Sequence, residues 1–303
     1  MGFASVSANT VQKLPGGAEP WQRELWSHAP EYGAEFVGTA FLVFCVVGAV
    51  GLMFAPVSTL ARWIPSMGVR LFLTGFVLGG AGSLVAVTPL GRLSGAHLNP
   101  AISLGFFAEK RMHVHDLFAY VAAQMAGAAV GAWGGQKTFG SLAVGVRDAL
   151  NQPGHNVTVP LALGAEIIAT FVLAAVVFEM LSRSRIMRWT PLAVVGVVGV
   201  IVWLDGNFSG ASLNPARSFG PVLVTSIWHL YWVYVVGPST GAVGAALVHR
   251  FGARRHANTG KLFHDHHYRS IFTGSSDHEA NDHVRRHAGA AQHERPPLHR
   301  RSR

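Results

Sequence analysis

The sequence predicts an all-α membrane protein, with six transmembrane helices and two re-entrant half-helices arranged as an inverted repeat. The first reason is composition, because hydrophobic residues make up 50% of the chain and charged residues 13%, against about 25% charged in soluble domains. The second is a series of apolar runs that approach or exceed the ~18 residues of a spanning helix. The third is a motif that occurs twice within these apolar surroundings.

The repeated motif reads Ser-Gly-Ala-His-Leu-Asn-Pro-Ala-Ile-Ser at residues 94–103 and Ser-Gly-Ala-Ser-Leu-Asn-Pro-Ala-Arg-Ser at residues 209–218. Asparagine is a favoured N-cap and proline is tolerated in the first helical turn, so each Asn-Pro-Ala predicts the start of a helix. We expect these helices at residues 100–108 and 215–224. Roughly ten helical residues rise about 15 Å, half of a ~30 Å hydrocarbon core. Paired half-helices of this kind mark a permeation site.

The two Asn-Pro-Ala motifs, with their flanking residues, resemble the aquaporin and aquaglyceroporin (major intrinsic protein) family over about residues 31–250. One triplet would be chance, but two at corresponding places in two membrane halves are specific. The resemblance implies a passive channel for water and/or small uncharged solutes, and a homotetramer with one pore per subunit. It also implies that the pore motifs are formed by Asn99, Pro100, Ala101, Asn214, Pro215 and Ala216.

The chain divides into five segments. Residues 1–30 form a cytoplasmic lead without the apolar core of a signal peptide. Residues 31–140 are the first membrane repeat and residues 141–159 the connection, which contains Gly, Asn and Pro. Residues 160–251 are the second repeat. Residues 252–303 are rich in His and Arg and poor in apolar residues, so we expect a disordered cytoplasmic tail.

Three full spans are expected in each repeat. Their approximate ranges are 31–53, 69–90, 117–135, 161–181, 189–204 and 228–251. Because three is odd, the second repeat enters the membrane upside down relative to the first. The two half-helices then enter from opposite faces, and Asn99 and Asn214 meet near the midplane.

Basic residues predict the orientation. Lys and Arg are more numerous beside the span ends that share a side with the two termini, so both termini should be cytoplasmic in a plasma membrane of the bacterial type. The net charge of +9 owes much to the far C-terminus. It therefore gives no support to nucleic-acid binding, and the expected partners are the lipid bilayer, water and small neutral solutes.

The pore chemistry follows from the two asparagines. Their side-chain amides can donate N–H bonds to a passing oxygen, while loop backbone occupies their carbonyls. The positive ends of two half-helices meet at the same point and repel cations. We therefore expect a channel that excludes protons and ions.

Size selection depends on a second set of residues. Arg217 resembles the arginine of the family's aromatic/arginine constriction, and the family register places the other three positions at Gly79, Val202 and Ala211. Strict water channels resemble one another in carrying an aromatic ring and a histidine at the positions that here are Gly79 and Val202, so this chain lacks both groups. The expected filter is thus wide and less polar, and glycerol, urea and metalloid hydroxides become candidate solutes beside water.

Two alternatives stay open for the filter. A one-residue shift would replace Gly79 by Leu78 or Gly80, neither of which is aromatic, and Gly79 could be a packing glycine. A strict water channel is the other alternative, if different side chains narrow the pore.

Three further residues are expected to support the pore. Glu35 and Glu166 occupy the same early position in the first span of each repeat, and the resemblance makes them internal braces of the re-entrant loops. The alternative is that each lies at the membrane edge in water. His97, two residues before Asn99, is expected to bind loop backbone and line the cytoplasmic vestibule.

Other function classes have weaker support. A secondary transporter with inverted repeats would need coupling charges at the midplane, where ionisable residues are scarce. No motif of an intramembrane enzyme is present, so we expect no catalytic residue, no cofactor and no metal site. The nine histidines of residues 252–303 could bind metals, sense pH or tether a solvated tail to lipid.

Overall fold

The computed structural model describes residues 26, 28–183 and 185–252. Among these, six helices are long and apolar enough to cross a membrane, which confirms the predicted spans. Five of them are α2 (Ala29–Phe54), α4 (Met67–Val87), α7 (Val114–Phe139), α9 (Val159–Leu181) and α12 (Tyr231–Phe251). The sixth, Met187–Asp205, consists of η2 (Met187–Trp189) and α10 (Thr190–Asp205). The proposed lead lies almost entirely outside the described residues, and so does the tail beyond Gly252.

Two shorter helices start at the Asn-Pro-Ala motifs. They are α6 (Pro100–Ala108) and α11 (Pro215–Thr225), with Asn99 and Asn214 as their N-caps. The remaining helical pieces are α3 (Thr59–Trp63), α5 (Pro89–Ser94), α8 (Ser141–Val144) and η1 (Arg147–Ala149). The described part contains no strand, as expected of a chain whose backbone hydrogen bonds must close within each segment.

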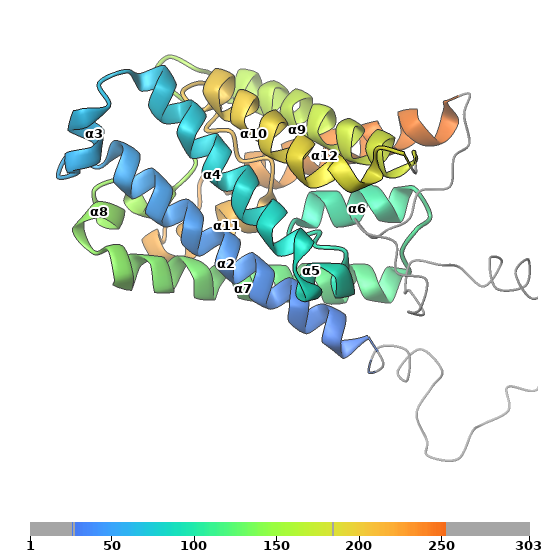
Figure 1. Ribbon diagram of the computed structural model, residues 1–303. Helices are drawn as coiled ribbons and strands as arrows, with labels where there is room; N and C mark the ends of the chain where they lie inside the picture. Colours follow the sequence, from blue (N-terminus) through green and yellow to red (C-terminus); the bar gives the residue numbers. More distant parts are fainter. Residues whose placement is uncertain (1–25, 27, 184, 253–303) are drawn as a thin grey trace, which may run out of the picture.

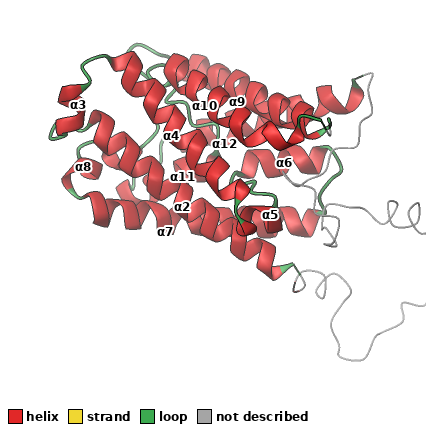
Figure 2. Cartoon of the chain, in the orientation of Figure 1, coloured by secondary structure: helices red, strands yellow, loops and turns green. Residues whose placement is uncertain are grey.

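The spanning helices lie alongside one another, and the described chain begins and ends at the same end of the molecule (Figures 1 and 2). We call the end with Ala29 and Gly252 the terminal face, and the end with α3 and α8 the distal face. From their N-termini, α6 runs toward the terminal face and α11 toward the distal face, as an inverted repeat requires.

Glycines let equivalent helix pairs approach closely in the two repeats. A Cβ added to Gly131 of α7 would lie 2.3 Å from the carbonyl oxygen of Ala40 in α2. In the second repeat, a Cβ added to Gly241 of α12 would lie 2.3 Å from that of Ile167 in α9. In lipid the hydrophobic effect does not drive helices together. Small residues at such contacts favour association because they let the helix backbones pack closely.

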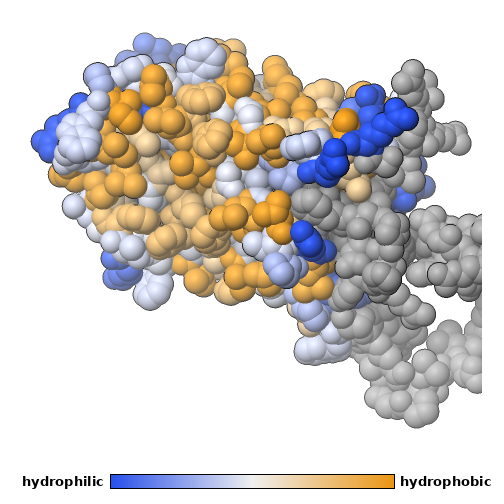
Figure 3. Space-filling model, viewed as in Figure 1, coloured by the Kyte–Doolittle hydropathy of each residue, from blue (hydrophilic) through white to orange (hydrophobic). Residues whose placement is uncertain are grey.

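The outer surface is suited to lipid. Hydrophobic residues cover the middle of the face in Figure 3, and hydrophilic residues gather toward its two ends. Large apolar side chains such as Phe118, Ile168 and Leu192 are exposed on the molecule. These observations agree with an integral, multi-pass membrane protein.

Candidate functional site

Two loops lead into the half-helices with the same unusual backbone. Ala96 and Leu98 have φ of 49°, and their counterparts Ala211 and Leu213 have φ of 45° and 58°. Left-handed conformations cost energy for residues with a Cβ, so surrounding contacts must hold them. The strain is a consequence of folding two extended loops back into the interior of the bundle.

Glu35 holds the first loop. Its Oε1 accepts the backbone N–H of His97 at 2.9 Å, and its Oε2 accepts that of Leu98 at 2.7 Å. Gln124 on α7 also donates to Oε2, at 2.7 Å. Glu35 is fully buried, so its carboxylate faces protein partners, as expected of an internal brace, and not water at the membrane edge.

Glu166 holds the second loop in the same way. Its two oxygens accept the backbone N–H groups of Ser212 at 2.7 Å and Leu213 at 2.9 Å. The hydroxyl of Ser209 donates to Oε1 at 2.9 Å. Loop N–H groups therefore occupy both carboxylates. Neither is free to bind a coupling ion, as a secondary transporter would require.

The two asparagines join the loops to each other. Asn99 caps α6 by accepting the N–H of Ala101 at 2.9 Å, and its Nδ2 donates to the carbonyl of Leu213 at 2.8 Å. Asn214 accepts the N–H of Ala216 at 2.9 Å, and its Nδ2 donates to the carbonyl of Leu98 at 2.8 Å. Each amide has two N–H donors, so one remains for a molecule in the adjacent chamber.

Two cavities lie in series through the molecule. The terminal chamber, about 130 Å³, is lined by His97, Asn99 and Asn214, together with many apolar side chains. The distal chamber, about 210 Å³, is lined by Thr74, Val146 and residues 149–152 among others. Each is large enough for several waters.

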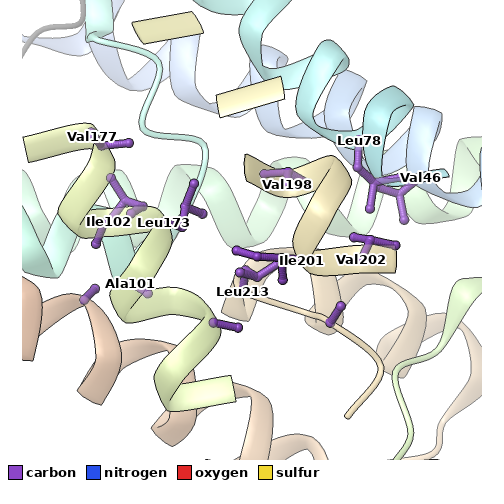
Figure 4. Packing of buried hydrophobic residues seen from close by; sticks show 14 of the residues in the cluster. Val46, Leu78, Ala101, Ile102, Leu173, Val177, Val198, Ile201, Val202 and Leu213 are labelled. Atoms are coloured by element: carbon purple, nitrogen blue, oxygen red, sulfur yellow. The ribbon is translucent and has the colours of Figure 1, made fainter. Parts of the chain in front are cut away.

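Leu78 and Arg217 line both chambers and so mark the boundary between them. Figure 4 shows Leu78 on α4 beside Val46 of α2. The boundary therefore has an aliphatic and a cationic lining residue.

Arg217 is buried and held from the distal loop. Its Nη1 donates to the carbonyl of Ala149 at 3.1 Å, whereas its Nε has no hydrogen-bond partner in the described chain. The loop itself is fixed by Asn151, which accepts from Ser218 at 2.7 Å and donates to the carbonyl of Gly210 at 2.7 Å. A guanidinium has five N–H donors, so those that Ala149 does not accept are available to a solute oxygen at the boundary.

The other expected filter residues do not all lie together. Val202 and Ala211 line the distal chamber with Arg217. Gly79 lines the terminal chamber, and a Cβ placed on it would lie 2.9 Å from the Cα of Val195 in α10. Gly79 thus makes a close helix contact, and Leu78, the neighbouring residue on α4, lines the boundary with Arg217.

His97 lines the terminal chamber. Its Nδ1 lies 3.0 Å from the hydroxyl of Ser103, and its ring stacks on Phe106 with centroids 4.5 Å apart. These contacts fix the imidazole against α6, while its backbone N–H is held by Glu35.

Sequence reasoning missed several supporting residues. Gln124 carried a signal, because it is a polar residue inside an apolar span. Tyr120 and Tyr234 also repeat a role, since each donates at 2.7 Å to the carbonyl of the serine that opens a motif. Ala149 carried none, because it acts only through its backbone carbonyl.

Comparisons with known proteins agree with this arrangement. Residues 23–249 match the model of the family described as major intrinsic protein. The chain is 35% identical over 242 residues to aquaporin AqpM of Methanothermobacter marburgensis, covering 72% of this chain and 95% of that protein. It is 36% identical to aquaporin-6 of Rattus norvegicus, covering 72% of this chain and 74% of that one.

A plant protein and a solved structure are also similar. Aquaporin NIP1-1 of Zea mays is 37% identical over 214 residues, covering 70% of this chain and 71% of its own. The X-ray structure of the aquaglyceroporin from Plasmodium falciparum has a TM-score of 0.60 at 23% identity. It covers 74% of this chain and 96% of that one, so the two proteins share the fold.

Proposed function

This chain belongs to the major intrinsic protein family and is a membrane channel for water and/or small solutes, and from that premise we propose that its pore passes small neutral solutes, such as glycerol, urea or a metalloid hydroxide, together with water. The observation that carries the proposal is the boundary between the two chambers. It pairs aliphatic Leu78 with cationic Arg217, and no aromatic ring lines both chambers in the described chain.

The filter that we propose consists of Leu78, Val202, Ala211 and Arg217. A polyol has hydroxyl groups that can accept from Arg217, and a carbon skeleton that can slide along Leu78 and Val202. Passing an aliphatic wall costs such a solute less free energy than it costs an ion, because an ion loses its hydration there without gaining a polar partner. The short side chain of Ala211 leaves room beside the guanidinium.

Exclusion of cations and protons is the second part of the proposal. The positive N-terminal ends of α6 and α11 lie beside Asn99 and Asn214, and Arg217 adds a buried cation on the same path. Among the described residues that line the two chambers, none is acidic. A water that accepts from both asparagines has its oxygen fixed, which interrupts a proton-conducting chain of waters.

Topology and assembly complete the proposal. Both termini face the cytoplasm of a bacterial-type cell, because the basic residues beside the spans are concentrated on the terminal face. The terminal chamber then opens toward the cytoplasm. The chain forms a homotetramer in which every subunit keeps its own pore, as in the family that it resembles, and the exposed apolar faces meet lipid or a neighbouring subunit.

Stopped-flow light scattering of proteoliposomes tests the proposal. Water flux and glycerol, urea or arsenite flux should each exceed those of protein-free liposomes, rise linearly with the solute gradient and ignore proton or sodium gradients. Liposomes that pass water but none of these solutes would overturn the proposed solute class. Flux driven by a proton or sodium gradient would overturn the channel mechanism.

A further inference from the structure

Among the described residues outside the pore, one cluster of metal-ligating side chains lies at the terminal face. His28 immediately precedes α2, and His115 and Asp116 lie in the first turn of α7. One ligand atom from each of these three residues lies within 4.8 Å of the other two. The cluster joins two helices that are distant in sequence and adjacent in the fold.

We propose that His28, His115 and Asp116 form a binding site for a divalent transition-metal ion of the zinc class. Two imidazoles and one carboxylate are a donor set that suits Zn²⁺ and its neighbours better than Mg²⁺ or Ca²⁺, which prefer oxygen ligands alone. Three protein ligands leave a fourth position for water. The sequence predicted no metal site because the ligands come from separate segments.

The carboxylate of Asp116 provides independent support. Its side chain is fully buried; Oδ1 accepts from the hydroxyl of Tyr32 at 2.6 Å and lies 2.8 Å from Nδ1 of His28. Among the described residues, its Oδ2 has no hydrogen-bond partner, and it lies 3.5 Å from Nε2 of His115. A buried carboxylate oxygen without a donor is costly, and a cation seated beside Oδ2 would offset that cost.

The cluster combines access with preorganisation. The side chains of His28 and His115 are each 19% exposed, so an ion can reach them from solution. The ring of His115 stacks on that of His113 with centroids 5.5 Å apart and planes 5° apart. Tyr32 orients the carboxylate from behind, as an outer partner of a metal ligand typically does.

Aromatic contacts connect the cluster to the terminal chamber. The ring of Tyr32 packs edge-on against that of Tyr120 at 5.9 Å, and Tyr120 packs against chamber-lining His97 at 5.3 Å. The metal site would therefore lie beside the pore mouth without contributing a ligand to the pore itself.

Metal titration of the full-length protein in detergent tests this site. Co²⁺ is added alone while its ligand-field absorption is recorded, and Zn²⁺ then competes for the same site. The titration of wild type should show a tight Co²⁺-binding step, and the absorption spectrum of the bound ion should be that of a low-coordinate site with nitrogen and oxygen ligands. His115→Gln should weaken that step more than about 100-fold, because loss of even an outer partner costs about 10- to 100-fold.

The controls separate this site from the other histidines. His113→Gln changes the stacked neighbour, which is not in the cluster, and should retain the tight step. His264→Gln with His266→Gln, in residues 252–303, should also retain it. If His115→Gln loses water flux and so fails to fold, His28→Gln replaces it. A tight step unchanged in the cluster variant, or abolished by the tail substitutions alone, would overturn the proposal.

Discussion

Asn99 and Asn214 each cap their own half-helix and bind the loop of the other. Both Nδ2 atoms donate across the pseudo-twofold axis at 2.8 Å, to the carbonyls of Leu213 and Leu98 respectively. The two repeats are thus joined at the point where both half-helix dipoles end. The same two side-chain amides connect the repeats and donate to a solute. A substitution at either asparagine therefore affects both the connection between the repeats and the binding of the solute.

The first prediction concerns charge at this junction. Asn214→Asp places a carboxylate beside the N-terminus of α11 and removes the donor to the carbonyl of Leu98. We expect increased sodium and proton conductance in proteoliposomes, because negative charge at a narrow, poorly screened point attracts cations. Asn156→Asp is the control, since Asn156 is exposed on the distal loop. Unchanged conductance in Asn214→Asp would refute the assigned barrier.

The second prediction concerns the guanidinium. Arg217→Val removes a buried positive charge and leaves the carbonyl of Ala149 without its donor. Cation leak should rise and the pore should widen at the chamber boundary, so glycerol flux should increase relative to water flux. Arg62→Val is the matched control, because Arg62 lies outside both chambers. Cation conductance is measured electrically, and both solute fluxes by light scattering. An Arg217→Val channel as tight to cations as wild type would contradict the assignment.

The third prediction concerns the two braces. Glu35→Gln and Glu166→Gln each replace one of two accepting oxygens by an N–H₂ group, which faces a backbone N–H. Leaving one buried donor unpaired costs about 1–3 kcal/mol. We expect a lower Tm in detergent and a loss of flux for both variants.

The matched control for the braces is Glu179→Gln. Glu179 is about half exposed and pairs with Arg183 one turn away, a type of contact worth little. Its Tm should stay close to that of wild type. Equal losses in all three variants would mean that the buried carboxylates do not hold the loops.

Some of this arrangement could be predicted from the sequence. The starts of α6 and α11 followed from Pro100 and Pro215, because proline fits the first helical turn and asparagine caps it. The spans followed from long apolar runs. Both are local signals, which a single sequence carries.

The filter could not be predicted as fully. Counting back from Asn99 to Gly79 passes through a loop, α5 and the end of α4, and a residue count does not fix the path of such a segment. Ala149 acts through its carbonyl, so its side chain gives no clue. The metal-ligating cluster of His28, His115 and Asp116 depends on the contact between α2 and α7, which only the fold provides.

The fourth prediction concerns the electrostatics of the distal loop. Burial raises the pKa of the Asp148 carboxyl, and a hydrogen bond from Gln136 at 3.1 Å offsets this only in part. A raised folded-state pKa means that the folded protein holds its proton more strongly than the unfolded chain, so ionised Asp148 destabilises the fold above that pKa. Asp148→Asn should therefore raise Tm at neutral pH.

The pH dependence checks the sign. The gain in Tm from Asp148→Asn should shrink as the pH falls through the raised pKa of Asp148, because the wild-type carboxyl then becomes neutral as well. Gln136→Glu, which places a second carboxylate next to Asp148, should lower Tm at neutral pH. A gain that grows on acidification would contradict the argument.

The last prediction concerns size selection at the chamber boundary. Leu78→Phe adds bulk at the boundary that Leu78 and Arg217 share, whereas Phe at position 79 would collide with the backbone of α10. Glycerol and arsenite flux should fall by about tenfold or more, while water flux stays within a few fold, since steric exclusion and each lost hydrogen bond of about 1 kcal/mol act on the larger solute. Leu78→Ala should shift the ratio the other way. Leu84→Phe is the control, because Leu84 lies on the same helix and is exposed on its outer side. A glycerol-to-water ratio unchanged by both Leu78 substitutions would mean that the pore is narrowest elsewhere.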